Sequence, residues 1–194
     1  MRLRTWASCT ALAALGTAAG YCLVLRGAVT LDLGVGRRTR SLGPLRQPIA
    51  APRDVVFDVI AGPYLGRTPR AMDAKLRVID RGSDLVLAAH YTPVALGLTA
   101  VTVETVAFQR PERVDFRLVR GPVPAVTETF HLEETPGGSE IRYTGEMATD
   151  LWRLGTWWGD VVAPAWERTV ERSLRGIADE AERRARSHVI GATP

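Results

Sequence analysis

Residues 49–60, IAAPRDVVFDVI, carry a transition from a strand to a helix. Residues 45–51 are predicted to form a short strand that ends at Pro52, because proline has no N–H to donate to a sheet. Beyond Pro52 the apolar side chains recur at helical spacing, at Val55, Val56, Val59 and Ile60. We therefore predict a helix that opens at residues 52–54 and is stopped by Gly62-Pro63, with residues 64–67 as a further helical turn in the alternative.

Six further strands are predicted between residues 75 and 149. Turn signals rich in glycine, proline and aspartate separate them at intervals of about 10–15 residues. The expected strands cover residues 75–80, 85–92, 98–108, 113–120, 125–134 and 140–149. Apolar and polar side chains alternate clearly in residues 113–120 and 141–147, which predicts an antiparallel sheet with one buried and one exposed face.

A long helix is predicted to close the chain. Apolar residues recur every three or four positions from Trp158 to Ala185, and charged residues cover the other side. Pro164 lies inside this pattern, and we expect it to kink the helix or to end a first short helix. A sheet of about seven strands needs both helices to cover its buried face, so the fold class is α+β. A sheet gripped by one long helix often encloses a cavity.

The stretch 49–60 resembles the opening strand and helix of the START-like, helix-grip superfamily (SRPBCC). Residues 110–116 (RPERVDF), residues 127–130 (TETF) and the Gly137-Gly138 hairpin are similar to its middle strands. The resemblance covers about residues 45–187 and implies a curved antiparallel sheet wrapped around a long C-terminal helix. The superfamily includes polyketide cyclase/dehydrase-like and lipid-transfer proteins and the birch-pollen-allergen fold. Its members share a hydrophobic cavity and no common catalytic set, so the resemblance implies an apolar ligand but assigns no catalytic residue.

Charge is divided unevenly along the chain, whose formal net charge is +4. Residues 1–46 hold seven arginines and one aspartate, a net charge of +6, whereas residues 47–194 carry −2. Nucleic-acid binding needs a basic surface on the folded domain, so we expect no nucleic-acid partner. The two cysteines, Cys9 and Cys22, precede the domain, which excludes a disulfide framework or a thiolate metal site within it. With three histidines in the chain, we expect no metal and no cofactor.

The N-terminal segment is predicted to be a transmembrane helix. Residues 5–25 form a run of 21 residues without a charge, with Arg2 and Arg4 before it and Arg26 after it. As a helix this run would be about 31 Å long, enough to cross a bilayer. A cleaved signal peptide and a soluble helix are the alternatives.

This interpretation divides the chain into an anchor (1–26), a basic linker (27–44), a helix-grip domain (45–188) and a tail (189–194). More arginines follow the apolar run than precede it. The positive-inside rule therefore favours a single-pass protein of the cell membrane with its domain in the cytoplasm, and an exported form is the alternative.

Two carboxylates are predicted on the apolar face of the sheet. Glu128 shares strand parity with Val126, Phe130 and Leu132. Glu104 is placed there less firmly, because both faces of its strand are fairly apolar. Buried carboxyls have raised pKa values and can act as a general acid or base, so Glu104 and Glu128 are the candidate catalytic residues. Ion pairs with Arg117 or Arg142, or exposure at a strand end, are the alternatives.

The other candidate ligand contacts are mostly aromatic. His90 and Tyr91 are neighbours on one strand, so only one faces inward, and a structural role is expected for His90. Four tryptophans (residues 152, 157, 158 and 166) bracket the start of the last helix, where they could fill the core, line a cavity mouth or lie at a membrane interface. The predicted ligand-binding set is Tyr91, Glu104, Phe116, Glu128, Phe130, Tyr143, Trp158 and Val162.

Three functions compete at this level. The first is a membrane-anchored domain that binds a hydrophobic small molecule or lipid in an internal cavity. The second is a cyclase/dehydrase- or aromatase-like enzyme that uses cavity carboxylates as acid and base. The third is a non-catalytic structural or chaperone-like module, which an exposed apolar patch around Trp157 would favour.

Overall fold

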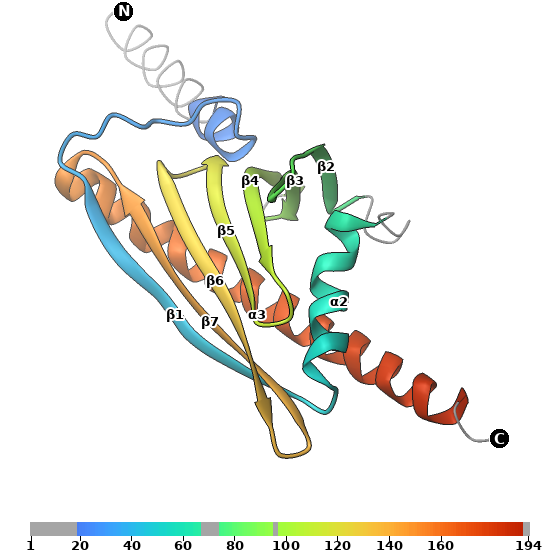
Figure 1. Cartoon of the computed structure of the whole chain (residues 1–194). Helices are drawn as coiled ribbons and strands as arrows, with labels where there is room; N and C mark the ends of the chain where they lie inside the picture. Colours follow the sequence, from blue (N-terminus) through green and yellow to red (C-terminus); the bar gives the residue numbers. More distant parts are fainter. Residues whose placement is uncertain (1–18, 67–73, 95–96, 192–194) are drawn as a thin grey trace, which may run out of the picture.

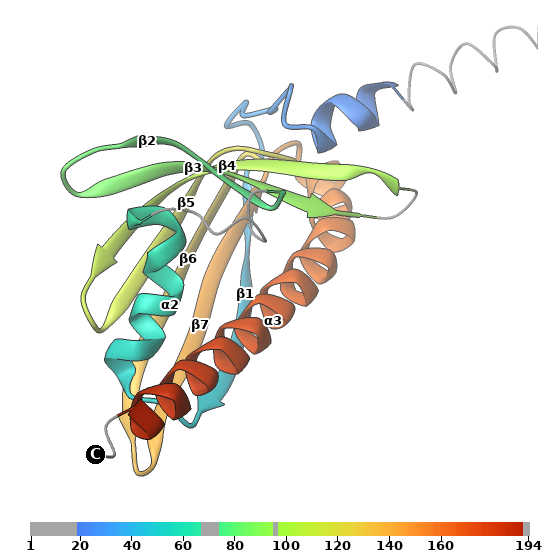
Figure 2. The same ribbon diagram turned by 90° about the vertical axis from the view of Figure 1, so that its right-hand side faces the viewer.

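A seven-stranded antiparallel sheet curves around two helices on one of its faces (Figures 1 and 2). The computed structural model describes residues 19–66, 74–94 and 97–191, with side chains to residue 187. The strands follow the spatial order β1-β7-β6-β5-β4-β3-β2, so every neighbouring pair except β1 and β7 is consecutive in the chain. The predicted α+β helix-grip architecture is confirmed.

Most elements lie where the sequence pattern places them. The strands are β1 (Arg38–Ile49), β2 (Leu76–Arg81), β3 (Leu85–Pro93), β4 (Thr99–Gln109), β5 (Arg113–Arg120), β6 (Ala125–Thr135) and β7 (Gly138–Thr149). The helices are α2 (Arg53–Leu65) and α3 (Trp152–Gly191). Helix α2 follows directly on Pro52 and runs through Pro63, so the predicted stop at Gly62-Pro63 is wrong by one turn.

The first strand is longer than predicted. It starts at Arg38 instead of residue 45, and its residues 38–42 pair with residues 145–149 of β7. Residues 38–44, which we expected in a basic linker, therefore belong to the sheet. Gly43 interrupts the register with a positive φ of 76°, a conformation that glycine adopts without a steric penalty.

The last helix is continuous through Pro164, so of the two predicted outcomes the end of a first short helix is wrong. Pro164 lies on the exposed side of the helix, whereas Ala163, Val170 and Leu174 are buried against the sheet and α2. Packing of the apolar side of α3 on β1, β7 and α2 holds the helix together across the proline. The core thus lies between the concave face of the sheet and the two helices.

The chain reaches β1 through a segment fastened to the start of α3. The Asp150 carboxylate accepts hydrogen bonds from the backbone N–H groups of Leu33 (2.7 Å) and Gly34 (2.8 Å) and pairs with the Arg37 guanidinium (2.8 Å). The Arg37 hydrogen bond holds the pKa of Asp150 down at about 2. Gly36, at a φ of +61°, brings the backbone against the Trp152 ring, where no side chain would fit.

Residues 19–25 are helical and lie at the end of the sheet where α3 begins (Figures 1 and 2). Within the described part of the chain, none of the helices combines the length and apolar character that crossing a bilayer requires. The predicted transmembrane helix falls mainly on residues 1–18, which are outside the described residues.

Candidate functional site

Four strands bring a row of mainly apolar side chains onto the concave face, and two carboxylates interrupt it. Phe116 of β5 is paired with Glu128 of β6, and Glu128 with Gly145 of β7. Glu104 of β4 lies on the same face, paired with Ala88 of β3. Only 6% of Glu104 and 9% of Glu128 is exposed to solvent. Both predicted inward orientations are therefore correct.

Glu128 is held by two donors from different elements. Its Oε1 accepts hydrogen bonds from the Tyr143 hydroxyl (2.7 Å) on β7 and from the Trp166 indole N–H (2.8 Å) on α3. Gly145 makes room for this arrangement, since a Cβ there would lie 3.1 Å from the Tyr143 hydroxyl and 3.3 Å from Glu128 Cγ. No described residue donates a hydrogen bond to the other oxygen, Oε2. That oxygen is the one a bound molecule could reach.

Burial changes the acidity of Glu128. Loss of solvent, reinforced by the negative charge of Glu104, raises the pKa of Glu128 to about 7, even though the two donors stabilise its ionised form. The carboxyl therefore exchanges its proton near neutral pH, which is the condition for an efficient general acid or base. The alternative of an ion pair with Arg142 is not realised, because Arg142 pairs with Glu133 on the opposite face.

Glu104 belongs to a second polar group, which links three elements. Its Oε1 accepts a hydrogen bond from the Thr102 hydroxyl (2.7 Å), and its Oε2 lies 3.0 Å from His90 Nδ1. His90 Nε2 lies 2.9 Å from the hydroxyl of Tyr64, which α2 carries into the same space. Burial alone opposes both charges, but their attraction lowers the pKa of Glu104 and raises the pKa of His90.

The protonation state of His90 determines whether the Tyr64 hydroxyl can donate a hydrogen bond to another group. Neutral His90 that donates from Nδ1 to Glu104 can only accept at Nε2, so the Tyr64 hydroxyl donates its hydrogen bond to that nitrogen. Protonated His90 donates from both nitrogens, and the Tyr64 hydroxyl then has its own proton free for another acceptor. Burial also raises the pKa of Tyr64, which keeps its proton in place. The site thus combines a carboxyl that titrates near pH 7 with a charged pair that directs a phenol.

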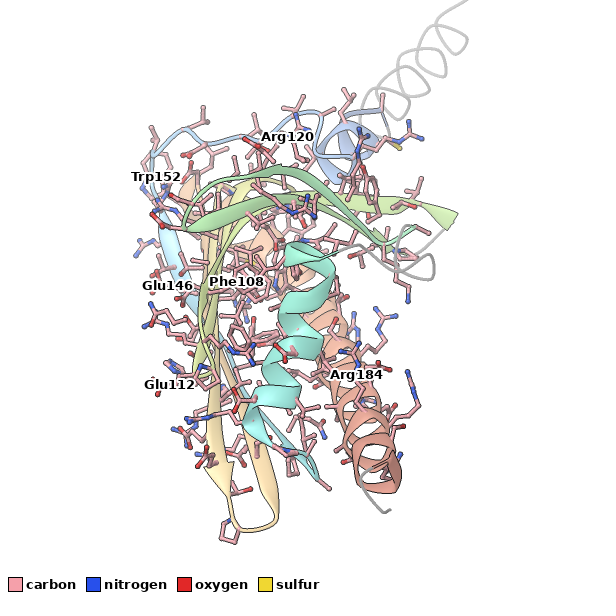
Figure 3. All side chains as sticks on the ribbon, turned by 45° about the vertical axis from the view of Figure 1, so that its right-hand side comes forward. Phe108, Glu112, Arg120, Glu146, Trp152 and Arg184 are labelled. Atoms are coloured by element: carbon pink, nitrogen blue, oxygen red, sulfur yellow. The ribbon has the colours of Figure 1, made fainter. Side chains whose placement is uncertain are left out.

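Aromatic rings fill the space between the two polar groups. Phe116 lies 5.1 Å from Phe130 and 6.3 Å from Tyr64, centroid to centroid. Phe108, which Figure 3 shows beside α2, lies 5.7 Å from the Tyr64 ring. Phe116 and Trp166 are only partly buried although they face the core, so solvent reaches part of this face. The polar groups are therefore set in an apolar surface that is not fully closed.

The structure brings together most of the predicted ligand contacts. Glu104, Phe116, Glu128, Phe130 and Tyr143 all lie on the concave face. Val162 of α3 is partly buried against the core.

Two predicted contacts lie elsewhere. Trp158 donates its indole N–H to the Pro122 carbonyl (2.8 Å), at the end of the sheet where residues 19–25 pack. Tyr91 lies on the opposite face from Glu104, because alternation along β3 turns His90 inward; its assignment to the concave face is wrong.

Tyr64, Thr102 and Trp166 are site residues that the sequence did not assign. Tyr64 continues the buried side of α2 that Phe57 and Ile60 define, and this spacing was the available signal. The hydrogen bond from Trp166 had no comparable signal, because it depends on how α3 lies across β6 and β7. His90 was considered and given a structural role, and its pairing with Glu104 places it inside the site.

No three His, Cys, Asp or Glu side chains converge into a metal-binding group in the part of the chain the structure describes. A separate polar cleft of about 330 Å³ lies between β1 and the start of α3, bordered by Arg38, Arg40, Thr149 and Asp160 among others. None of the predicted site residues lines this cleft.

Residues 45–182 match the family model described as polyketide cyclase / dehydrase and lipid transport. The chain belongs to this family. Comparison with curated proteins gives no match. Solved structures with the family's fold are similar over most of the chain but share little sequence with it, and they support the fold alone.

Norcoclaurine synthase from Thalictrum flavum is 16% identical with a TM-score of 0.57, and the match covers 74% of this chain and 87% of that one. The Zhui aromatase/cyclase from Streptomyces sp. R1128 is 15% identical with a TM-score of 0.54, over 76% of this chain and 95% of that one. The di-domain aromatase/cyclase BexL of the BE-7585A biosynthetic pathway is 15% identical with a TM-score of 0.55. There the match covers 77% of this chain but only 50% of BexL, so the chain spans half of that protein.

Proposed function

We propose that the concave face binds a hydrophobic small molecule or lipid that carries a hydroxyl group. The observation that carries the proposal is Glu128, a buried carboxylate on an apolar face whose Oε2 has no donor among the described residues. Oε2 is not among the buried side-chain atoms that lack a partner, so water can reach it. A ligand hydroxyl that replaces this water would donate a hydrogen bond to the ionised oxygen in largely apolar surroundings.

The surroundings of Glu128 support an apolar body for this ligand. Phe116, Trp166 and Val162 are partly exposed although they face the core, and a hydrophobic molecule would remove that area from water. The family description, which joins cyclase/dehydrase proteins with lipid transport, fits a ligand of this class.

Photo-crosslinking tests this binding proposal. The full chain, reconstituted in lipid nanodiscs, is irradiated with a long-chain alcohol that bears a diazirine, and the labelled peptides are mapped by mass spectrometry. We expect labels on peptides that contain Phe116 and Trp166. Glu128→Gln should lower this labelling about tenfold at pH 8, since loss of a hydrogen bond to a charged group costs about 1.5–3 kcal/mol.

Glu133→Gln is the matched control, because Glu133 lies on the same strand and faces solvent on the other side of the sheet. The control should label like the wild type. Labels restricted to peptides outside the concave face, or equal labelling of the two variants, would contradict the proposal.

An acid–base enzyme is the second candidate, and the pKa of about 7 at Glu128 favours it. For a β-hydroxy ketone on this face, ionised Glu128 would remove the proton between the two functional groups, and the carboxyl formed would then donate that proton to the departing hydroxyl. The C–O bond breaks, a C=C bond forms, and water leaves. The lowered pKa of Glu104 makes it a poor proton donor, so its role in this candidate is to hold His90.

Loss of water from a β-hydroxy ketone, followed by mass spectrometry, tests this second candidate. Turnover should disappear in Glu128→Gln and persist in Glu133→Gln. A chain that binds the alcohol probe but never dehydrates the ketone is a binding protein.

We further propose that residues 1–26 anchor the chain in the cell membrane as a single span, with the domain on the cytoplasmic side. The uncharged run of residues 5–25 and the arginines that follow it support this. Resistance to carbonate extraction tests the anchor, and a reporter fused after Pro194 tests its orientation. Release by carbonate, or a processed chain that lacks its first 20 residues or so, would contradict the proposal.

A further inference from the structure

The first turns of α3 expose an apolar stripe that packing of the domain does not explain. Leu154, Trp157 and Val161 are 61%, 60% and 49% exposed. Their spacing of three and four residues places them on one side of the helix, opposite the side that Gly155, Gly159 and Ala163 bury. We call these three residues the α3 stripe. A lone exposed apolar residue is ordinary, but a row that includes tryptophan marks a contact surface.

The stripe lies beside the place where the apolar N-terminal run enters the structure. The Trp157 ring is 6.3 Å from the Trp158 ring, and Trp158 is 6.2 Å from Tyr21 in an edge-on contact. Tyr21 belongs to helical residues 19–25, the last part of the uncharged run that starts at Thr5. Both views place the helical segment 19–25 at the end of the domain where α3 begins (Figures 1 and 2).

More exposed apolar side chains occur in the segment that follows. Leu31, Leu33 and Val35 are 54%, 55% and 47% exposed. The segment is fixed to the start of α3, since Leu151 N–H donates to the Val35 carbonyl (2.8 Å) and Asp150 accepts from Leu33 N–H. The apolar surface at this end of the domain therefore has two parts, joined by these two hydrogen bonds.

Toward the C-terminus, charged residues replace the apolar residues of the α3 stripe. The same side of α3 continues with Arg168, Arg172 and Arg175, all exposed. Arg175 lies about 32 Å along the helix from Leu154, at about 1.5 Å per residue. Only the first turns of α3 are thus suited to an apolar environment, and cations replace apolar residues beyond them.

We propose that the α3 stripe, with Leu31, Leu33 and Val35, docks into the headgroup region of the bilayer that holds the N-terminal run. This inference rests on the proposed anchor. Tryptophan beside leucine, bordered by arginine, is the composition that lies at a membrane interface, where the indole ring is apolar and its N–H reaches water. The contact from Trp158 to Tyr21 ties the stripe to the exit point of the run, so an anchored chain already holds the stripe near the lipid.

A fluorescent label that reports its surroundings tests the docking. The full chain, with Cys9 and Cys22 changed to serine, receives one cysteine by Leu154→Cys and is labelled with an NBD fluorophore. It is reconstituted in vesicles of phosphatidylcholine and phosphatidylglycerol. We expect a blue-shifted emission that lipids with brominated acyl chains quench. Arg175→Cys, on the same side of α3, is the matched control. A label at this position should show the emission of a probe in water and should not be quenched by the brominated lipids.

The outcomes separate this inference from the anchor on which it rests. A chain that floats with the vesicles while the label at 154 reports water, as the label at 175 does, overturns the docking and leaves the anchor standing. A chain that does not float overturns both. A blue shift that persists in detergent and grows with protein concentration identifies a second copy of the chain as the occupant, and it also overturns the docking.

Discussion

The raised pKa of Glu128 predicts how the stability of this domain depends on pH. On folding, the pKa of Glu128 rises from an ordinary value near 4.5 to about 7. Between these values the folded chain keeps the proton while the unfolded chain has released it, so rising pH favours the unfolded state. The stability associated with this carboxyl is complete below pH 4.5 and is lost as the pH rises to 7 and above.

Glu128→Gln isolates this effect. Glutamine keeps an oxygen that accepts hydrogen bonds from Tyr143 and Trp166, and its NH₂ group replaces the oxygen to which no described residue donates. The variant cannot ionise, so its stability should exceed that of the wild type by an amount that grows with pH. The difference between pH 4 and pH 8 should be about 3 kcal/mol. For a domain of this size that is about 10 °C in melting temperature.

Thermal unfolding of both chains, followed by circular dichroism from pH 4 to pH 8, measures the difference. Glu133→Gln, on the exposed face of the same strand, is not expected to reproduce it. A difference between wild type and Glu128→Gln that stays flat across this range, or that shrinks as the pH rises, would refute the argument that burial governs this carboxyl.

Three other changes have defined outcomes. Trp166→Phe removes a hydrogen-bond donor that stabilises ionised Glu128, so the pKa of Glu128 should rise by about 1. In the same thermal-unfolding series, the midpoint of the pH-dependent loss of stability should move to higher pH. Asp150→Ala should cost about 3 kcal/mol in urea unfolding at pH 7, because three donors lose their acceptor. Gly36→Ala should destabilise the domain by several kcal/mol in the same assay, because the added Cβ would meet the Trp152 ring. Gly34→Ala has open space around it and should cost only the roughly 1–2 kcal/mol of a left-handed backbone conformation.

Turn signals were sufficient to separate the six later strands, and alternation supported those with one buried and one exposed face, such as β6. The start of β1 was missed because its first residues, Arg38, Thr39 and Arg40, are all exposed and show no alternation. Pro164 was overestimated as a break because helix propensity describes an isolated helix, and here burial of Ala163 and Val170 outweighs the missing hydrogen bond.

The candidate site was predictable to the extent that it lies on strands. Parity alone placed Glu128 and Glu104 on the concave face. Alternation along β3 did not show which of His90 and Tyr91 faces the concave side, because apolar residues occupy both faces of that strand. The partners supplied by helices, Tyr64 and Trp166, depend on how α2 and α3 cross the sheet, and a single sequence carries no record of that geometry.

The length of β1 bears on any attempt to shorten this protein. The family match begins at residue 45, and a truncation there would appear to preserve the whole domain. It would delete residues 38–42, which pair with residues 145–149, and leave the second half of β7 as a sheet edge that pairs only with β6. Newly exposed strand edges of this kind recruit other chains, so the shortened product should aggregate on expression. A soluble version that keeps the fold should instead begin near Gly27, upstream of the residues that Asp150 holds.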